Sequence, residues 1–139
     1  MQLTDLNPTH DIGANCLLVE MGPFRFIFDC GMHPKKAGRA ALPALTKLAD
    51  DSVDFILVTH SHLDHIGGIS GAARAPRIDA VWTSPLADPV SGVRAVGDLL
   101  GQRGVRPQAV TAGASIDVGP VHLDVLGPAT AFHHTRSDP

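Results

Sequence analysis

Three histidines and one aspartate fall within the six residues His60-Ser61-His62-Leu63-Asp64-His65, and Ile66-Gly67-Gly68 follows them. Neutral imidazole and carboxylate groups are the ligands that zinc and similar divalent ions take from proteins. His60 and His62 are two residues apart, so their side chains point the same way if extended geometry persists. Asp64 and His65 come where a helix can begin, and their directions diverge enough to serve a second centre. The spacing predicts one half of a metal site and is compatible with two ions.

A strand must position this cluster, because the run Val53-Asp54-Phe55-Ile56-Leu57-Val58-Thr59 directly before it is strongly β-like. Where a strand ends, side chains of neighbouring residues can converge. The rest of the chain alternates between strand and helix patterns, with a hairpin at each end. The predicted elements are strands Cys16–Glu20 and Phe24–Cys30, a helix Leu42–Ala49, the strand Phe55–Thr59, a short helix Gly68–Ala73, a strand Ile78–Trp82, a helix Pro89–Gln102, and strands Ser115–Val118 and Val121–Leu126.

This order predicts a mixed α/β fold in which helices cover the faces of a sheet. Phe24, Phe26 and Phe28 alternate along one strand, so we expect them to share a core face. A length of 139 residues favours a single domain that spans residues 1–139.

The amino-acid composition is ordinary for a globular protein and excludes few functions. Apolar residues make up 44% of the chain and charged residues 18%, and the formal net charge is −3. Such a charge gives no global attraction to nucleic acid or to anionic membranes, and no apolar run is long enough to span a bilayer. We therefore expect a cytoplasmic protein that does not bind membranes. Lys35, Lys36 and Arg39 form a tight basic cluster, which we interpret as a solvated loop.

The two cysteines, Cys16 and Cys30, lie on neighbouring predicted strands. Two cysteines do not make a disulfide framework in a chain of this size. We expect free, half-buried thiols, with a pairing between the two strands as the alternative.

A metal held by His60 and His62 needs at least one more protein ligand from elsewhere. His122 alternates with the apolar residues of its strand and is expected to face solvent, whereas His33 lies in a loop beyond a strand end, from which it could approach the cluster. His134 also follows a predicted strand; it either closes a three-histidine set or belongs to an exposed tail. The candidates are His10, His33, His122, His133 and His134. Asp29 ends a strand and is well placed to orient a metal-binding imidazole.

The segment from Thr59 to Gly68 resembles the signature of the metallo-β-lactamase-fold hydrolases. Ile12-Gly13-Ala14-Asn15-Cys16 and Phe28-Asp29-Cys30-Gly31-Met32-His33-Pro34 are similar to the β-CASP branch, the ribonucleases that process or degrade RNA. The resemblance covers about residues 10 to 70. It implies an αββα sandwich, of which this chain would be the N-terminal portion, with the metal site at the edge where the two sheets meet.

The same resemblance implies a role for each site residue. His60 and His62 would bind the first of two zinc ions, and Asp64 and His65 the second. His134 would add a ligand to the first ion, and Asp29 would support the site from outside the ligand shell. Asp64 would also be the catalytic residue that orients the nucleophile.

The chain departs from the family in its second half. The family takes a bridging aspartate and a final histidine from that half, and Asp138 lies too near His134 to be the bridging residue. The β-CASP cap domain is absent as well. We therefore expect an incomplete domain: a fragment of a longer protein, or a chain whose missing half comes from a partner.

Three functions follow from these residues. The first is a zinc-dependent phosphodiesterase, most simply a ribonuclease in RNA processing, that uses a metal-activated hydroxide. The second is a metallo-hydrolase of a small molecule such as a thioester or lactone. The third is a catalytically incomplete, metal-binding half-domain that acts as an interaction subunit.

Overall fold

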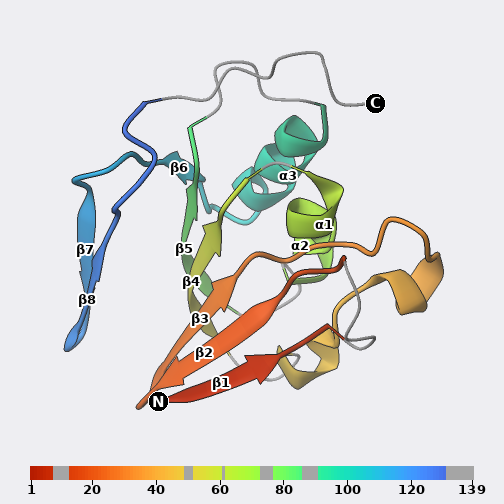
Figure 1. The fold of residues 1–139 in the computed structure, drawn as a ribbon, viewed down its shortest axis with the longest axis horizontal. Helices are drawn as coiled ribbons and strands as arrows, with labels where there is room; N and C mark the ends of the chain where they lie inside the picture. The colour runs from red at the N-terminus through yellow and green to blue at the C-terminus, as the bar shows by residue number, and fades with distance from the viewer. Residues whose placement is uncertain (8–12, 49–51, 61, 73–76, 86–90, 131–139) are drawn as a thin grey trace.

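The computed structural model describes residues 1–7, 13–48, 52–60, 62–72, 77–85 and 91–130 (Figure 1). Within these residues a mixed sheet of six strands is flanked by helices on one face and by a two-stranded hairpin on the other. The strands are β1 (Gln2–Asp5), β2 (Leu17–Met21), β3 (Phe24–Phe28), β4 (Val53–Val58), β5 (Ile78–Thr83), β6 (Gln108–Ala109), β7 (Ser115–Val118) and β8 (Val121–Asp124). The helices are η1 (Gly38–Ala41), η2 (Leu45–Leu48), α1 (Leu63–Ile66), α2 (Ile69–Ala72) and α3 (Ser91–Gly101).

Sheet order follows chain order from β1 to β6. The pairs β1–β2 and β2–β3 are antiparallel, whereas β3–β4, β4–β5 and β5–β6 are parallel. In the β3–β4 register, Phe28 lies opposite Leu57. Both strands therefore end at the same edge of the sheet, and the residues that leave them come together there. In parallel sheets this carboxyl-end edge is where ligands usually bind.

The alternating side chains of β4 divide the core between the two faces of the sheet. Ile56 and Val58 belong to a buried cluster on the side of the helices. Phe55 belongs to a second cluster, on the side of β7 and β8, where its ring meets that of Trp82 edge-on at a centroid distance of 5.0 Å. The described residues thus form three layers, namely helices, the six-stranded sheet and the hairpin, and the mixed α/β class predicted from the sequence is confirmed.

The hairpin of β2 and β3 forms with Phe24, Phe26 and Phe28 on one face, as predicted. The α-helix predicted over Leu42–Ala49 is wrong: among its described residues only Leu45–Leu48 are helical, as the 3₁₀ helix η2, and η1 ends before Leu42. Ala49 lies outside the described residues. Leu42 is extended, with φ −99° and ψ 150°. A residue before proline is forced out of the helical region, so Pro43 prevents a helix from starting there.

Two short strands, β1 and β6, were not predicted from the sequence. β1 has an exposed, polar sequence, and β6 is only two residues long. Neither carries the periodic apolar signal on which a strand prediction depends. Both lie at the outer edges of the sheet, where pairing with one neighbour positions them.

Cys16 and Cys30 are free thiols, and both are fully buried rather than half-buried. A hydrogen bond with Cys16, followed by burial, raises the pKa of the Cys30 thiol well above its usual value. In the described residues no helix is long and apolar enough to cross a membrane.

Candidate metal centre

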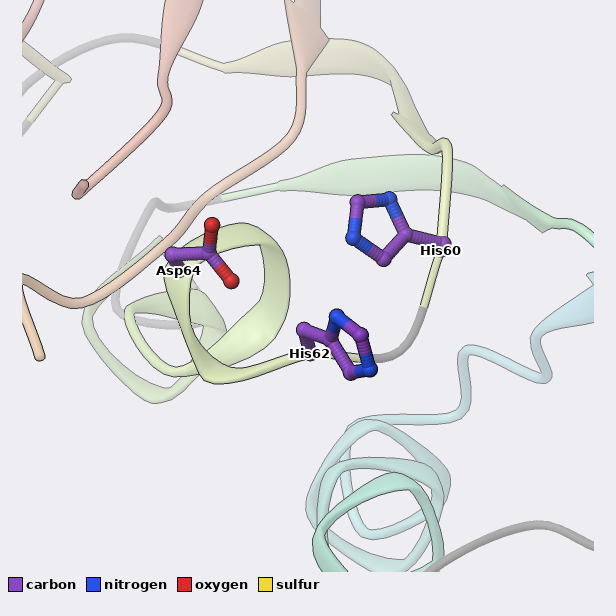
Figure 2. A group of neighbouring side chains, drawn as sticks. All are labelled: His60, His62 and Asp64. Atoms are coloured by element: carbon purple, nitrogen blue, oxygen red, sulfur yellow. The ribbon is translucent and has the colours of Figure 1, made fainter. Parts of the chain in front are cut away.

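Three potential metal ligands converge beyond the end of β4. One donor atom from each of His60, His62 and Asp64 lies within 4.8 Å of the others, and this is the one such group found among the described residues. Figure 2 shows the three side chains pointing toward a common space, with Asp64 carried by α1. Three of the four ligands predicted in this segment are therefore brought together by the strand end and by the first turn of the helix that follows, and the fourth, His65, lies beside Asp64.

The turn from strand to helix is fixed by the backbone. The His62 carbonyl accepts hydrogen bonds from the amides of His65 (2.9 Å) and Ile66 (3.0 Å), so α1 begins directly after this histidine. Asp64 is consequently held in the first turn.

The helix α1 is tied to the loop that leaves β3. The Cys30 amide donates to the His65 carbonyl at 2.7 Å, and the Gly68 amide donates to the Cys30 carbonyl at 2.7 Å. Gly31 lies directly against the Asp64 carbonyl, where a Cβ atom would overlap the backbone of α1. This packing joins the ends of β3 and β4 into one unit.

Asp29 connects that unit to the imidazole of His65. It follows β3 in a left-handed conformation, with φ 57°, and its side chain is buried. Its carboxylate accepts the Thr59 amide at 2.8 Å and the Thr59 hydroxyl at 2.9 Å. The same carboxylate lies 2.7 Å from His65 Nδ1. Because an ionised carboxylate can only accept, the neutral form of the His65 ring carries its proton on Nδ1 and presents the Nε2 lone pair.

The Nε2 atom of His65 faces two further side chains. It lies 3.1 Å from the Asn15 side-chain nitrogen and 3.4 Å from Asp64 Oδ2. Asp64 is thus close to His65 as well as to His60 and His62. A carboxylate with all three imidazoles within reach can contribute to either ion of a two-metal centre.

The rings of the three histidines crowd one another. The centroids of His60 and His65 are 3.6 Å apart, and those of His60 and His62 are 4.9 Å apart. Burial, followed by the positive charge that His65 and His62 can carry, lowers the pKa of His60. A lowered pKa keeps an imidazole neutral near physiological pH, and neutral imidazole is the form that binds metal.

The donor set of two imidazoles and one carboxylate fits zinc. Neighbouring ligands of tetrahedral zinc are about 3.3 Å apart at ligand distances of about 2.0–2.1 Å. The spread of up to 4.8 Å among His60, His62 and Asp64 is wider, so the side chains must draw together to hold an ion. His62 is exposed and Asp64 is partly exposed, which leaves room for such a movement.

The remaining histidines are placed as follows. His10, His133 and His134 lie outside the described residues. His33 is buried, its Nδ1 accepts the Lys35 amide at 3.1 Å, and it is not a member of the group of His60, His62 and Asp64. His122 faces solvent as expected, where hydrogen bonding to Asp117 and the charge of Asp124 raise its pKa.

Two open clefts adjoin the centre and share Phe28 and Thr59. One has a volume of about 840 Å³ and is also lined by Asn15, Asp29 and His65. The other has a volume of about 350 Å³, lies between the ends of β4 and β5 and the segment after β8, and is largely apolar. Thr59 and Asn15 contact the site, but no role was assigned to them from the sequence. The sequence signals that could have identified them are the position of Thr59 directly before the histidine motif and the position of Asn15 directly before a predicted strand.

Comparison with known proteins gives a consistent result. The family model described as Metallo-beta-lactamase superfamily matches residues 11–135. The chain is similar to Cleavage and polyadenylation specificity factor 73 of Drosophila melanogaster, with 32% identity over 69 residues, which are 50% of this chain and 10% of that protein. It is also similar to Endoribonuclease YSH1 of Mycosarcoma maydis, with 35% identity over 65 residues, which are 47% of this chain and 7% of that protein.

Both matches thus span a tenth or less of the relative's own length. Among solved structures, the Rm3 metallo-beta-lactamase superposes with a TM-score of 0.50 and 21% identity, covering 81% of this chain and 44% of that one. This likeness concerns the fold.

Proposed function

Because this chain belongs to the metallo-β-lactamase superfamily, we propose that it is part of a metal-dependent hydrolase whose centre is built on His60, His62 and Asp64. The observation that carries this proposal is the convergence of their donor atoms within 4.8 Å at the carboxyl-end edge of the sheet. Zinc is the proposed metal, since two imidazoles and a carboxylate suit it.

A complete centre would hold two ions. Asp64 and His65, whose facing atoms are 3.4 Å apart, are the proposed ligands of the second. His134 is the proposed additional ligand of the first. Asp29 would act from behind His65, because its contact with Nδ1 directs the Nε2 lone pair outward.

The proposed reaction is hydrolysis of a phosphodiester in RNA. Bound divalent ions lower the pKa of water and stabilise negative charge on phosphoryl oxygens. Among the residues of this chain, Asp64, whose side chain is partly exposed, is the proposed residue that orients the nucleophile and accepts its proton. The RNA substrate is supported by the relative named an endoribonuclease and by the motif around Asp29. RNA-processing partner chains are proposed on the same basis.

A second candidate is hydrolysis of a small molecule at the same centre. It is favoured by the apolar cleft of about 350 Å³ beside Thr59, a size typical of small-ligand sites. Thioesters and lactones have the matching chemistry, namely an apolar body and an acyl carbon open to attack.

The test compares both substrates with and without metal. Purified chain is stripped with a chelator, reloaded with zinc, and incubated with end-labelled RNA or with a chromogenic thioester. We expect RNA cleavage that disappears with the chelator and returns with zinc. Thioester hydrolysis alone would favour the second candidate, whereas metal binding without either activity would favour an interaction half-domain.

Replacing Asp29 by asparagine should weaken metal binding by about 10–100-fold, the usual effect of losing a partner of a metal-binding histidine. The asparagine side chain is isosteric, but its amide can donate to His65 Nδ1. The ring would then carry its proton on Nε2, and the lone pair would no longer face the centre. Isothermal titration with zinc measures the change. The control is Asp79→Asn, because Asp79 is an exposed residue of β5 whose carboxylate pairs with Arg77. Equal zinc affinities in the two variants would contradict the role of Asp29.

A further inference from the structure

Asn15 has a contact that the proposed hydrolase centre does not use. Its side-chain nitrogen lies 3.1 Å from His65 Nε2. The opposite ring nitrogen is occupied by Asp29 at 2.7 Å. The amide of Asn15 therefore donates to the one lone pair of the neutral ring, and that lone pair can accept only one partner at a time.

The main chain of Asn15 is anchored to the same unit as His65. Its amide donates to the Asp64 carbonyl at 3.0 Å, and its carbonyl accepts the Gly31 amide at 2.9 Å. These bonds fix the residue to both α1 and the loop after β3. The position of the side chain relative to His65 is thus set by backbone contacts that do not depend on the side chain itself.

Asn15 also lines the cleft of about 840 Å³, together with His65 and Asp29. Its side chain is partly exposed there. The amide can therefore turn away from the ring toward solvent without losing its hydrogen-bonding capacity.

We propose that Asn15 is a positioning residue that holds His65 Nε2 through its side-chain amide and is displaced when a second divalent ion binds to that nitrogen. Asn15 then weakens the binding of the second ion, which His65 would hold, and leaves the binding of the first ion by His60 and His62 unchanged. The inference rests on the proposed metal centre but not on the identity of the substrate.

The size of the effect follows from one hydrogen bond. A net contribution of about 1 kcal/mol corresponds to about a fivefold change in a binding constant. Removing the amide should strengthen binding of the second ion by this factor. A role in folding alone would instead lower the thermal stability and weaken both binding steps together.

The experiment resolves the two steps by titrating the chain with zinc or cobalt against a chelating dye. We expect Asn15→Ala to tighten the second step about fivefold and to leave the first unchanged. Asn15→Asp, which keeps the shape and the backbone bonds but cannot donate when ionised, should tighten it further because it adds a negative charge. Leu17→Ala is the control, since Leu17 lines the same cleft but its side chain has no group that can donate a hydrogen bond to His65; both steps should be unchanged.

A second readout does not depend on metal. Long-range ¹H–¹⁵N spectra of the metal-stripped chain, recorded where His65 is neutral, should place its proton on Nδ1 and report a changed Nε2 environment in Asn15→Ala. The proposal is overturned if the second step is unchanged or weaker in Asn15→Ala, if the chain binds no second ion, or if the proton is on Nε2. Neither readout measures hydrolysis, so a chain that fails to cleave RNA can still bear out or overturn the role of Asn15.

Discussion

Replacing Asp64 by alanine should reduce RNA cleavage by about 10³-fold or more while the protein remains folded. The substitution removes a proposed metal ligand and the proposed proton acceptor together, and proton transfer alone accounts for about 10²–10⁴-fold in many enzymes. The fold should survive because the structural contact of Asp64 is made by its backbone carbonyl, which accepts the Asn15 amide at 3.0 Å. The side chain is partly exposed, so its removal leaves no buried polar group without a partner at that position.

The measurement is the initial rate of cleavage of labelled RNA at saturating zinc, with circular dichroism to check the fold. Asp98→Ala is the matched control, because Asp98 is an exposed aspartate on a helix, α3, outside the centre. Its rate should equal that of the unmodified chain. A folded Asp64→Ala variant that keeps more than a tenth of the activity would remove Asp64 from the mechanism.

Replacing Gly31 by alanine should destabilise the protein by at least about 3 kcal/mol, at the upper end of single substitutions. The new Cβ atom would overlap the carbonyl group of Asp64 and come within 2.9 Å of the Asn15 amide nitrogen. Both neighbours are backbone, so no side-chain rotation can relieve the overlap. The helix α1 would have to move, and the proposed ligands that it carries would move with it.

The effect is measured by urea unfolding, with zinc titration of the folded fraction as a second readout. Gly97→Ala is the control: Gly97 lies in α3 with nothing within 4 Å of the added atom. Because alanine favours a helix over glycine by about 1 kcal/mol, that variant should be slightly more stable. Similar unfolding curves for the two variants would show that α1 does not pack on Gly31 in solution.

The features predicted correctly from the sequence are those that depend only on residues close together in the chain. The β2–β3 hairpin, the strand β4 and the histidine cluster each lie within a few consecutive residues, so periodicity and spacing are sufficient. The position of Asp29 beside the cluster also follows from the sequence, since it requires only that two strands end at one edge.

The features that were missed depend on partners distant in the chain. Asn15 meets His65 across 50 residues, and no local pattern reports that contact. His33 was expected in a loop from which it could approach the cluster, but it is buried and its backbone amide donates to the Ala41 carbonyl. The helix expected at Leu42–Ala49 was wrong for a local reason, the restriction that Pro43 places on Leu42.

The central claim is that His60, His62 and Asp64 bind a divalent metal ion. Its most direct test is the zinc content of the purified chain, measured by elemental analysis for the unmodified protein, His62→Ala and His122→Ala. His122 is the control because it is an exposed histidine on β8, outside the group of three. We predict at least one bound zinc per chain in the unmodified protein and in His122→Ala, and its loss in His62→Ala. Equal zinc content in all three proteins, or none in any of them, would contradict the claim.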